Sequence, residues 1–236
     1  MEEEKKTGNM TLVEMNISDK FQLLTRLPLM QGLGGKDLAY IEETLGLHVN
    51  KCTTMPLAVQ GDLCRDLTFV TDGLVTREQN TEDGRIRTIS CLQTPMAIEP
   101  ECLYGISCLY AASYRAQPGA GIIRIGKRDV NMLVDRYEIF RLNYMNALCS
   151  ALHRERLRRD PCREKDAREK MLALLRKAFE GCTGGAQVIA KMTDIADRIG
   201  ETRLNASKAL NALQDEGVLR LTRGRLLIDD VGRLWM

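Results

Sequence analysis

The sequence contains no uninterrupted apolar run of the ~18 residues that a membrane-spanning helix requires. Its first residues are charged and do not resemble a signal peptide. Both absences favour a cytoplasmic protein without membrane contact. Histidine is also scarce, since His48 and His153 are the two occurrences in the chain. A catalytic or metal site built on histidine is therefore not expected.

The eight cysteines include no Cys-x-x-Cys pair, which argues against a zinc or dithiol site. We interpret them as small buried thiols, and we expect no bound metal and no catalytic residues. Hydrophobic residues make up 44% and charged residues 28% of the chain, as in globular proteins. The 236 residues suit two domains. The net charge is +2, and residues 161–236 are only mildly basic.

Glycine and proline divide the first half of the chain into short apolar segments. Residues 1–20 are polar and predict a loosely held arm, and residues 36–45 have the spacing of a short amphipathic helix. Apolar runs then alternate with turns up to residue 126. The Asp83-Gly84 dipeptide predicts a hairpin between strands that begin near Leu74 and Ile86. This pattern predicts an antiparallel β-roll over residues 21–128.

A single long helix is predicted over residues 129–160. Residues 129–159 contain neither glycine nor proline, and their apolar side chains recur every three or four positions. At ~1.5 Å per residue this helix would extend for ~46 Å, which is more than a compact domain requires. It is either a core helix that lies across the roll or a helix through which two copies pair, and we favour the second. The expected dimer contacts are Tyr137, Phe140, Tyr144, Ala147, Leu148 and Ala151.

The C-terminal segment, residues 161–236, has the spacing of a winged helix. A helix is predicted over residues 168–180, and Thr193 and Thr202 are expected to cap two further helices that Gly200 separates. Two apolar runs, residues 218–221 and 226–228, flank a turn that has Arg223 and Arg225 at its tip. A helix, a helix-turn-helix and a basic hairpin in this order make a winged helix.

Taken together, these parts resemble the Crp/Fnr family of bacterial transcription regulators over nearly the whole chain. The motifs are LPLMQG (27–32), QGD (60–62) and FVTDGLV (69–75) in the roll, and IADRIGETRLNASKALNAL (195–213) in the helix-turn-helix. The resemblance implies an α+β protein with a cyclic-nucleotide-binding-like β-roll (a double-stranded β-helix), a dimerisation helix and a winged helix. It also implies a homodimer that binds a palindromic site on double-stranded DNA. We expect RNA polymerase as a further partner.

On this scaffold the polar residues of the tail fall where DNA contacts are expected. The first turns of a recognition helix enter the major groove, where arginine can pair with guanine and asparagine with adenine. Threonine at the cap and arginine on the wing suit phosphates. The predicted DNA-binding residues are Thr202, Arg203, Asn205, Ser207, Lys208, Arg223 and Arg225.

The roll departs from the family members that bind cyclic nucleotides. Those members carry a Gly-Glu pair for the ribose and an Arg-Ser pair for the cyclic phosphate. Pro100 and Glu101 occupy the first place here, Tyr110 and Ala111 occupy the second, and Arg115 is displaced. A buried phosphate without a forked cation is poorly compensated, so tight binding of cyclic AMP or cyclic GMP is not expected. Glu101, Tyr110 and Arg115 are the candidate lining of an effector pocket.

No cofactor is indicated by a motif. Iron–sulfur members of the family use cysteines near the N-terminus, and no cysteine precedes Cys52. Haem ligation by His48, His153 or a cysteine is a further alternative, although no haem-binding motif is present. The leading hypothesis is a DNA-binding regulator with an unidentified effector or none. The alternative is a sensory or interaction module that binds a small ligand or haem without contacting DNA. An enzyme is not expected, because no nucleophile–base or metal constellation is present.

Overall fold

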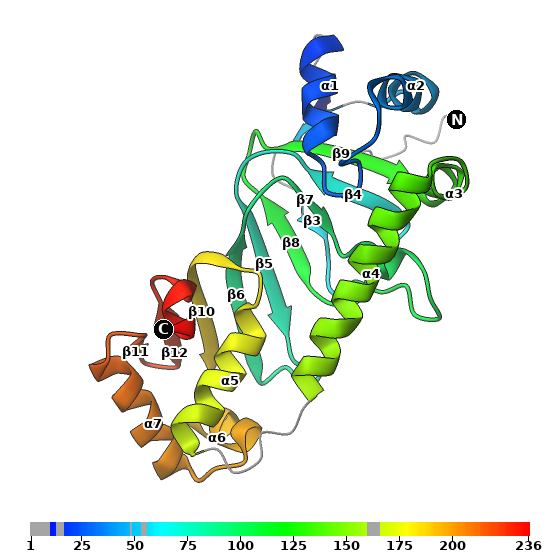
Figure 1. Cartoon of the computed structure of the whole chain (residues 1–236). Helices are drawn as coiled ribbons and strands as arrows, with labels where there is room; N and C mark the ends of the chain where they lie inside the picture. The colour runs from blue at the N-terminus through cyan, green and yellow to red at the C-terminus, as the bar shows by residue number, and fades with distance from the viewer. Residues whose placement is uncertain (1–9, 13–16, 48, 53–55, 160–165) are drawn as a thin grey trace, which may run out of the picture. The chain divides into compact units, whose positions relative to one another are not determined.

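The computed structural model describes residues 10–12, 17–47, 49–52, 56–159 and 166–236. The chain folds as two compact units (Figure 1). The first unit contains Met1–Val75 and Gln93–Arg154, and the second contains Thr76–Leu92 and Glu155–Met236. The segment Thr76–Leu92, which the sequence places in the roll 21–128, therefore groups with the C-terminal part of the chain.

The first unit is built on antiparallel strands, as the sequence predicts. One sheet has the order β1 (Met10–Leu12), β2 (Asn50–Cys52), β9 (Gly121–Gly126), β4 (Asp66–Val70) and β7 (Met96–Ile98). A further pair joins β3 (Pro56–Ala58) to β8 (Ser113–Ala116). Apolar side chains of the central strands β4 and β9, including Leu67, Phe69, Ile122 and Ile123, are fully buried in the core. The roll thus forms around the most apolar strands of the sequence.

Helices α1 (Ile17–Arg26), α2 (Gly35–Leu45), α3 (Lys127–Arg136) and α4 (Glu138–Arg159) complete the first unit, with a short 3-10 helix, η1 (Pro100–Leu103). Two predictions for this region are wrong. The segment 1–20 is not a loose arm throughout, because β1 pairs with β2 and α1 begins at Ile17. The predicted helix 129–160 is two helices, since Tyr137 is extended, with φ −113° and ψ 106°. The Arg141 guanidinium donates to the Val134 carbonyl at the break, which satisfies one of the backbone groups that the break releases.

The apolar seam predicted for the dimer is largely part of the first unit's own core. Phe140 is 0% exposed and Tyr144 is 3% exposed within the single chain, and Tyr137 is also buried. The Tyr144 hydroxyl donates to the Pro100 carbonyl, and its ring meets that of Tyr104 edge-on at 5.7 Å. Tyr137, Phe140 and Tyr144 are therefore packed in the core of their own chain, as the core-helix alternative expects, and are not exposed to a second copy. Ala147, Leu148 and Ala151 are only partly buried.

The second unit is a winged helix extended by a hairpin. Helices α5 (Ala167–Phe179), α6 (Met192–Ile199) and α7 (Arg203–Asp215) pack with β10 (Thr183–Ala190), β11 (Arg220–Thr222), β12 (Arg225–Ile228) and a 3-10 helix, η2 (Val231–Trp235). The predicted hairpin forms from β5 (Val75–Asn80) and β6 (Ile86–Leu92). The strand order within this unit is β11-β12-β10-β6-β5. Strand β10, which the sequence analysis missed, lies between the wing and the hairpin.

The hairpin contributes directly to the core of the second unit. Ile86 packs in the same apolar cluster as Phe179, Val188 and Leu226. The buried Cys182 thiol donates to the Ser90 hydroxyl at 3.1 Å, and β6 pairs with β10 from Ile86 to Cys91. The winged helix of this protein is therefore completed by a segment that lies about a hundred residues earlier in the sequence.

The burial of Phe140 predicts that its loss affects folding. Phe140→Ala should lower the free energy of unfolding by ~3–5 kcal/mol, because the ring leaves a cavity in a packed core. The exposed Asn146 on the same helix is the control. Its replacement by alanine should change stability by less than ~0.5 kcal/mol. Urea unfolding followed by circular dichroism measures both, and equal stability of the two variants would contradict the burial of Phe140.

Candidate nucleic-acid interface

A three-residue turn, residues 200–202, joins α6 to α7. Gly200 ends α6 in the left-handed conformation, with φ 66° and ψ 40°, and its amide donates to the Ala196 and Asp197 carbonyls. Glycine adopts this conformation without the penalty that a Cβ atom brings. The predicted end of α6 is confirmed, but its predicted cap is wrong. The N-cap is Lys191, which makes no side-chain cap bond, and Thr193 already lies inside the helix.

Thr202 caps α7 as the sequence predicts. Its hydroxyl oxygen accepts the Asn205 amide at 3.2 Å, and Arg203 is the first helical residue. The amides of the first turn point out of the helix end, which carries a partial positive charge and favours anions such as phosphate. The Thr202 oxygen is thus committed to the helix, while its hydrogen remains able to donate to a phosphate.

One face of α7 is buried and the other is open. Successive residues turn by about 100°, so the outer face lies opposite the buried side chains. The exposed residues of the first two turns are Arg203, Leu204, Asn205 and Lys208, and Ser207 is half-buried. The buried residues are Ala206, Ala209, Leu210 and Leu213. Neither Arg203 nor Lys208 forms an ion pair with any residue that the structure describes.

Asn205 differs from its neighbours because its amide is already engaged. Its Nδ2 donates to Glu201 Oε2 at 3.0 Å, and Lys170 Nζ donates to the other oxygen of Glu201 at 2.6 Å. The hydrogen bond from Lys170, followed by that from Asn205, holds the pKa of Glu201 below its usual value. Glu201 is therefore ionised at neutral pH. The second Nδ2 hydrogen and the Oδ1 acceptor remain for a bidentate pair with adenine, which Asn205 could form while its other Nδ2 hydrogen stays on Glu201.

The wing presents two further free cations. Strands β11 and β12 pair in the register that brings Thr222 opposite Arg225, which leaves Arg223 and Gly224 at the tip. Arg223 and Arg225 are exposed and form no ion pair within the described part of the chain. Arg220, two residues before Thr222 on β11, is instead held by Asp229 at 2.6 Å. The structure thus separates a paired arginine from two that remain available to an anion.

Three residues of this surface, Leu204, Glu201 and Lys170, were not predicted from the sequence. Leu204 is 64% exposed on the outer face of α7 between Arg203 and Asn205. The spacing of the apolar positions on α7 would have placed it outside the core. Glu201 and Lys170 control the Asn205 amide, but Lys170 comes from α5. No sequence signal pairs it with Glu201, because a contact between separate helices depends on how they pack.

The hairpin also touches the helix-turn-helix. Arg85, next to the hairpin turn, lies 3.6 Å from Asp197 and 4.0 Å from Asp194 on α6. Its guanidinium lies near two acidic groups on the first helix of the pair. Both ion pairs are partly exposed, so their contribution to stability is small. They place the tip of the hairpin against α6 within the second unit.

The geometry of α5, α6, α7 and the wing agrees with a known family. Residues 169–235 match the family model described as the Crp-like helix-turn-helix domain. This part of the chain is a Crp-like helix-turn-helix domain. The resemblance to Crp/Fnr regulators drawn from the sequence is thereby confirmed for the segment with the strongest motif. No curated protein sequence shows significant similarity to the chain.

Solved structures extend the likeness beyond the Crp-like domain. The catabolite activator protein of Thermus thermophilus is 23% identical, with a TM-score of 0.50 over 88% of this chain and 96% of its own. A putative Crp/Fnr-family regulator of Eubacterium rectale is 18% identical, with a TM-score of 0.49 over 89% of this chain and 96% of its own. The first likeness shows a shared fold, which confirms the predicted α+β class with a β-roll before the Crp-like domain.

The residues predicted to line an effector pocket differ in their exposure. Tyr110 is buried beside the Cys64 thiol, whereas Glu101 and Arg115 are exposed. Ala111, in the place of the family's phosphate-binding pair, donates its amide to the Glu99 carboxylate at 2.7 Å. Glu99, which the sequence analysis did not single out, occupies the position before Pro100. Burial raises the pKa of the Tyr110 hydroxyl, so that group stays protonated.

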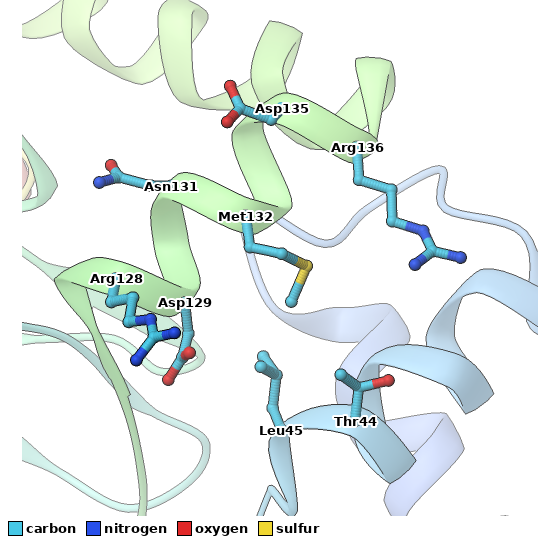
Figure 2. Close-up of a pocket in the computed structure, with 8 residues that line it drawn as sticks. All are labelled: Thr44, Leu45, Arg128, Asp129, Asn131, Met132, Asp135 and Arg136. Atoms are coloured by element: carbon cyan, nitrogen blue, oxygen red, sulfur yellow. The ribbon is translucent and has the colours of Figure 1, made fainter.

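An open pocket of about 750 Å³ lies elsewhere on the first unit, between the end of α2 and α3 (Figure 2). Met132 extends towards Leu45, whereas Asn131 and Asp135 point away from it. The Arg136 guanidinium lies 3.9 Å from the centre of the Tyr40 ring. The polar groups of this pocket do not converge on one point, so it offers no defined ligand chemistry.

The described residues hold no group of three or more His, Cys, Asp or Glu side chains that could bind a metal ion. His153 is exposed on α4, and His48 lies outside the described residues. Among the helices that the structure describes, none is both long and apolar enough to cross a membrane.

The cap of the recognition helix predicts a measurable cost. Thr202→Ala should destabilise the protein by about 1 kcal/mol, because the Asn205 amide loses its acceptor at the helix end. Thr202→Ser keeps that acceptor and should stay within a few tenths of a kcal/mol of the wild type. Chemical denaturation of the three proteins compares them. If serine is as destabilising as alanine, the cap bond is not what stabilises α7.

Proposed function

We propose that this protein is a sequence-specific regulator of transcription that binds a palindromic DNA site as a homodimer. One α7 helix enters the major groove of each half-site, and the two wings contact the flanking backbone. The β-roll carries an unidentified effector or none. The observation that carries this proposal is the set of exposed cations, Arg203, Lys208, Arg223 and Arg225, on a Crp-like domain.

The exposed residues of α7 fit two kinds of DNA contact. Arg203 lies at the first turn, where a guanidinium can reach the O6 and N7 atoms of a guanine. Leu204 offers an apolar surface of the kind that packs on a thymine methyl group. Arg223 and Arg225 extend from the wing tip, and Lys208 from the second turn of α7; these three suit phosphates.

The dimer is supported by a face of α4 that the sequence analysis did not choose. Leu142, Met145 and Leu152 are 49%, 53% and 55% exposed, and Cys149 is exposed between them. We call these four residues the α4 stripe. Their spacing of three, four and three is that of the a and d positions of a coiled coil. At about 100° per residue the α4 stripe faces away from Phe140 and Tyr144.

A second copy of the same helix is the occupant that this stripe fits. A stripe on one helix is complementary to itself when a two-fold axis relates two copies. Pairing would remove from water three large apolar side chains per chain that are otherwise half-exposed. The two Crp-like domains of such a dimer would read half-sites centred one helical turn, about 10 base pairs, or a multiple apart.

Replacing Arg203 and replacing Arg223 should reduce DNA-binding affinity in different ways, because the first is proposed to contact a base and the second a phosphate. Arg203→Ala should lose ~1–3 kcal/mol on the specific site and relax the preference at one position per half-site. Arg223→Ala should weaken binding to specific and random duplexes alike and reduce the salt slope by about one unit. Fluorescence anisotropy on both duplexes over a salt series separates the two patterns. Equal losses of the Arg203 variant on both duplexes would make Arg203 a phosphate contact only.

Charge placed on the α4 stripe should break the dimer. The double variant Leu142→Glu, Met145→Glu should sediment as a folded monomer and bind the palindromic site far more weakly, because like charges would meet across the two-fold axis. Ile106→Glu is the matched control, since Ile106 is apolar and fully exposed but is not part of α4. A wild-type protein that sediments as a monomer at micromolar concentration would overturn the proposal.

Cys149 gives an independent measure of the same pairing. In a parallel helix pair the two copies of Cys149 lie at the same level, and oxidation by diamide should join their thiols as an intermolecular disulfide. The test is made in a protein that carries Cys162→Ser, so that Cys162, which lies outside the described residues, cannot form the cross-link. Adding Cys149→Ser should abolish the covalent dimer on a non-reducing gel. Cross-linking that persists without Cys149 would argue against this face.

A further inference from the structure

Glu99 has an unusual backbone conformation in the first unit. Its φ of 35° and ψ of 60° lie in the left-handed region, and no other non-glycine residue that the structure describes has a positive φ. A side chain with a Cβ atom is unfavourable there, and such strain persists only where the surroundings fix it. The residue immediately precedes η1. The Cys102 amide donates to the Glu99 carbonyl at 2.9 Å, and the Glu99 side chain makes further contacts.

The Glu99 carboxylate receives three hydrogen bonds from three different segments. The Ala111 amide donates to Oε2 at 2.7 Å, and the Cys102 thiol donates to the same oxygen at 3.2 Å. The Tyr114 hydroxyl, on β8, donates to Oε1 at 2.9 Å. A backbone amide and two side-chain donors that converge on one carboxylate have the chemistry of an oxyanion site.

Two of the three donors are held by contacts other than those to Glu99. Tyr114 is 5% exposed, and the Tyr110 amide next to Ala111 bonds to the Asp62 carbonyl. Burial, and after it the negative charge of Glu99, raises the pKa of the Cys102 thiol, so the thiol keeps its proton and remains a donor. Among the described residues no lysine or arginine forms an ion pair with Glu99. Its charge is met by hydrogen bonds.

We infer that the Ala111 amide, the Tyr114 hydroxyl and the Cys102 thiol form an anion-binding site in the roll, and that Glu99 is its built-in occupant. The carboxylate holds the segment 99–114 closed on itself and excludes external oxyanions of the same chemistry, whether carboxylate or phosphate. The roll is thereby ordered at this place without an effector. When the Glu99 carboxylate is removed, the three donors are left to bind a small oxyanion from solution.

Chemical rescue of the full-length chain tests this inference. Glu99→Ala should melt at a lower temperature than the wild type in chloride, and acetate or formate at matched ionic strength should restore part of the loss. The restoration should saturate with anion concentration, as ligand linkage requires. Inorganic phosphate in a parallel series shows whether the site also takes a larger oxyanion or is restricted to carboxylates. The wild type should not respond to any of these anions beyond its response to chloride.

Three variants separate occupancy of the site from charge and strain. Glu99→Gln keeps an oxygen in the site, so it should melt near the wild type and should not respond to acetate. Glu99→Gly removes the backbone penalty together with the carboxylate. In chloride it should melt at a higher temperature than Glu99→Ala, and acetate should stabilise it in the same way. It replaces Glu99→Ala in the test if the alanine variant does not fold. Adding Tyr114→Phe to Glu99→Gly removes one donor and should weaken acetate binding several-fold.

The outcomes that would overturn the inference are equally specific. Alanine and glycine variants that are as stable as the wild type would show that the carboxylate fixes nothing. Variants that are destabilised but gain no more from acetate, formate or phosphate than from chloride would show that the donors form no anion site. Saturable stabilisation of the wild type by acetate would show that the site is open while Glu99 is present.

Discussion

The pairing of β10 with β6 is the constraint on which the second unit depends. Strand β10 has β12 on one side and β6 on the other, so both of its backbone edges are satisfied. Without β6, β10 would expose an edge of unpaired amides and carbonyls beside the wing. The wing sheet supports the core that α5 and α7 cover, and Ile86 of the hairpin is part of that core. The placement of the recognition helix thus depends on a segment from the first half of the chain.

Helices α4 and α7 are both amphipathic, but their exposed faces differ in composition. Each helix buries one apolar face against its own unit, and what remains exposed is available to a partner. On α7 the exposed face is mainly polar and basic, and Arg203 and Lys208 form no ion pair with the described residues, which suits DNA. On α4 the exposed face is apolar, which suits a second copy. The composition of its exposed face therefore decides which kind of partner each helix suits.

In the roll, an internal carboxylate occupies the hydrogen-bond donors beside Ala111. The forked cation that a cyclic phosphate requires is absent from the place that the family uses, and the Ala111 amide is bonded to Glu99. The left-handed backbone of Glu99 is balanced by three hydrogen bonds to its carboxylate. An intramolecular group costs no binding entropy, so such contacts can order a binding fold permanently.

The sequence by itself determined the local features: the hairpin turn at Asp83-Gly84, the end of α6 at Gly200, the cap at Thr202 and the basic tip of the wing. Each depends on residues close together in the chain, whose chemistry fixes the backbone directly. The tertiary structure alone decided which face of α4 is core, that β6 completes the winged helix, and that Glu99 meets Ala111 and Tyr114. These contacts join residues far apart in the chain, so no local pattern encodes them. Periodicity showed that Phe140 belongs to an apolar face, but only packing decided that this face is covered by its own chain.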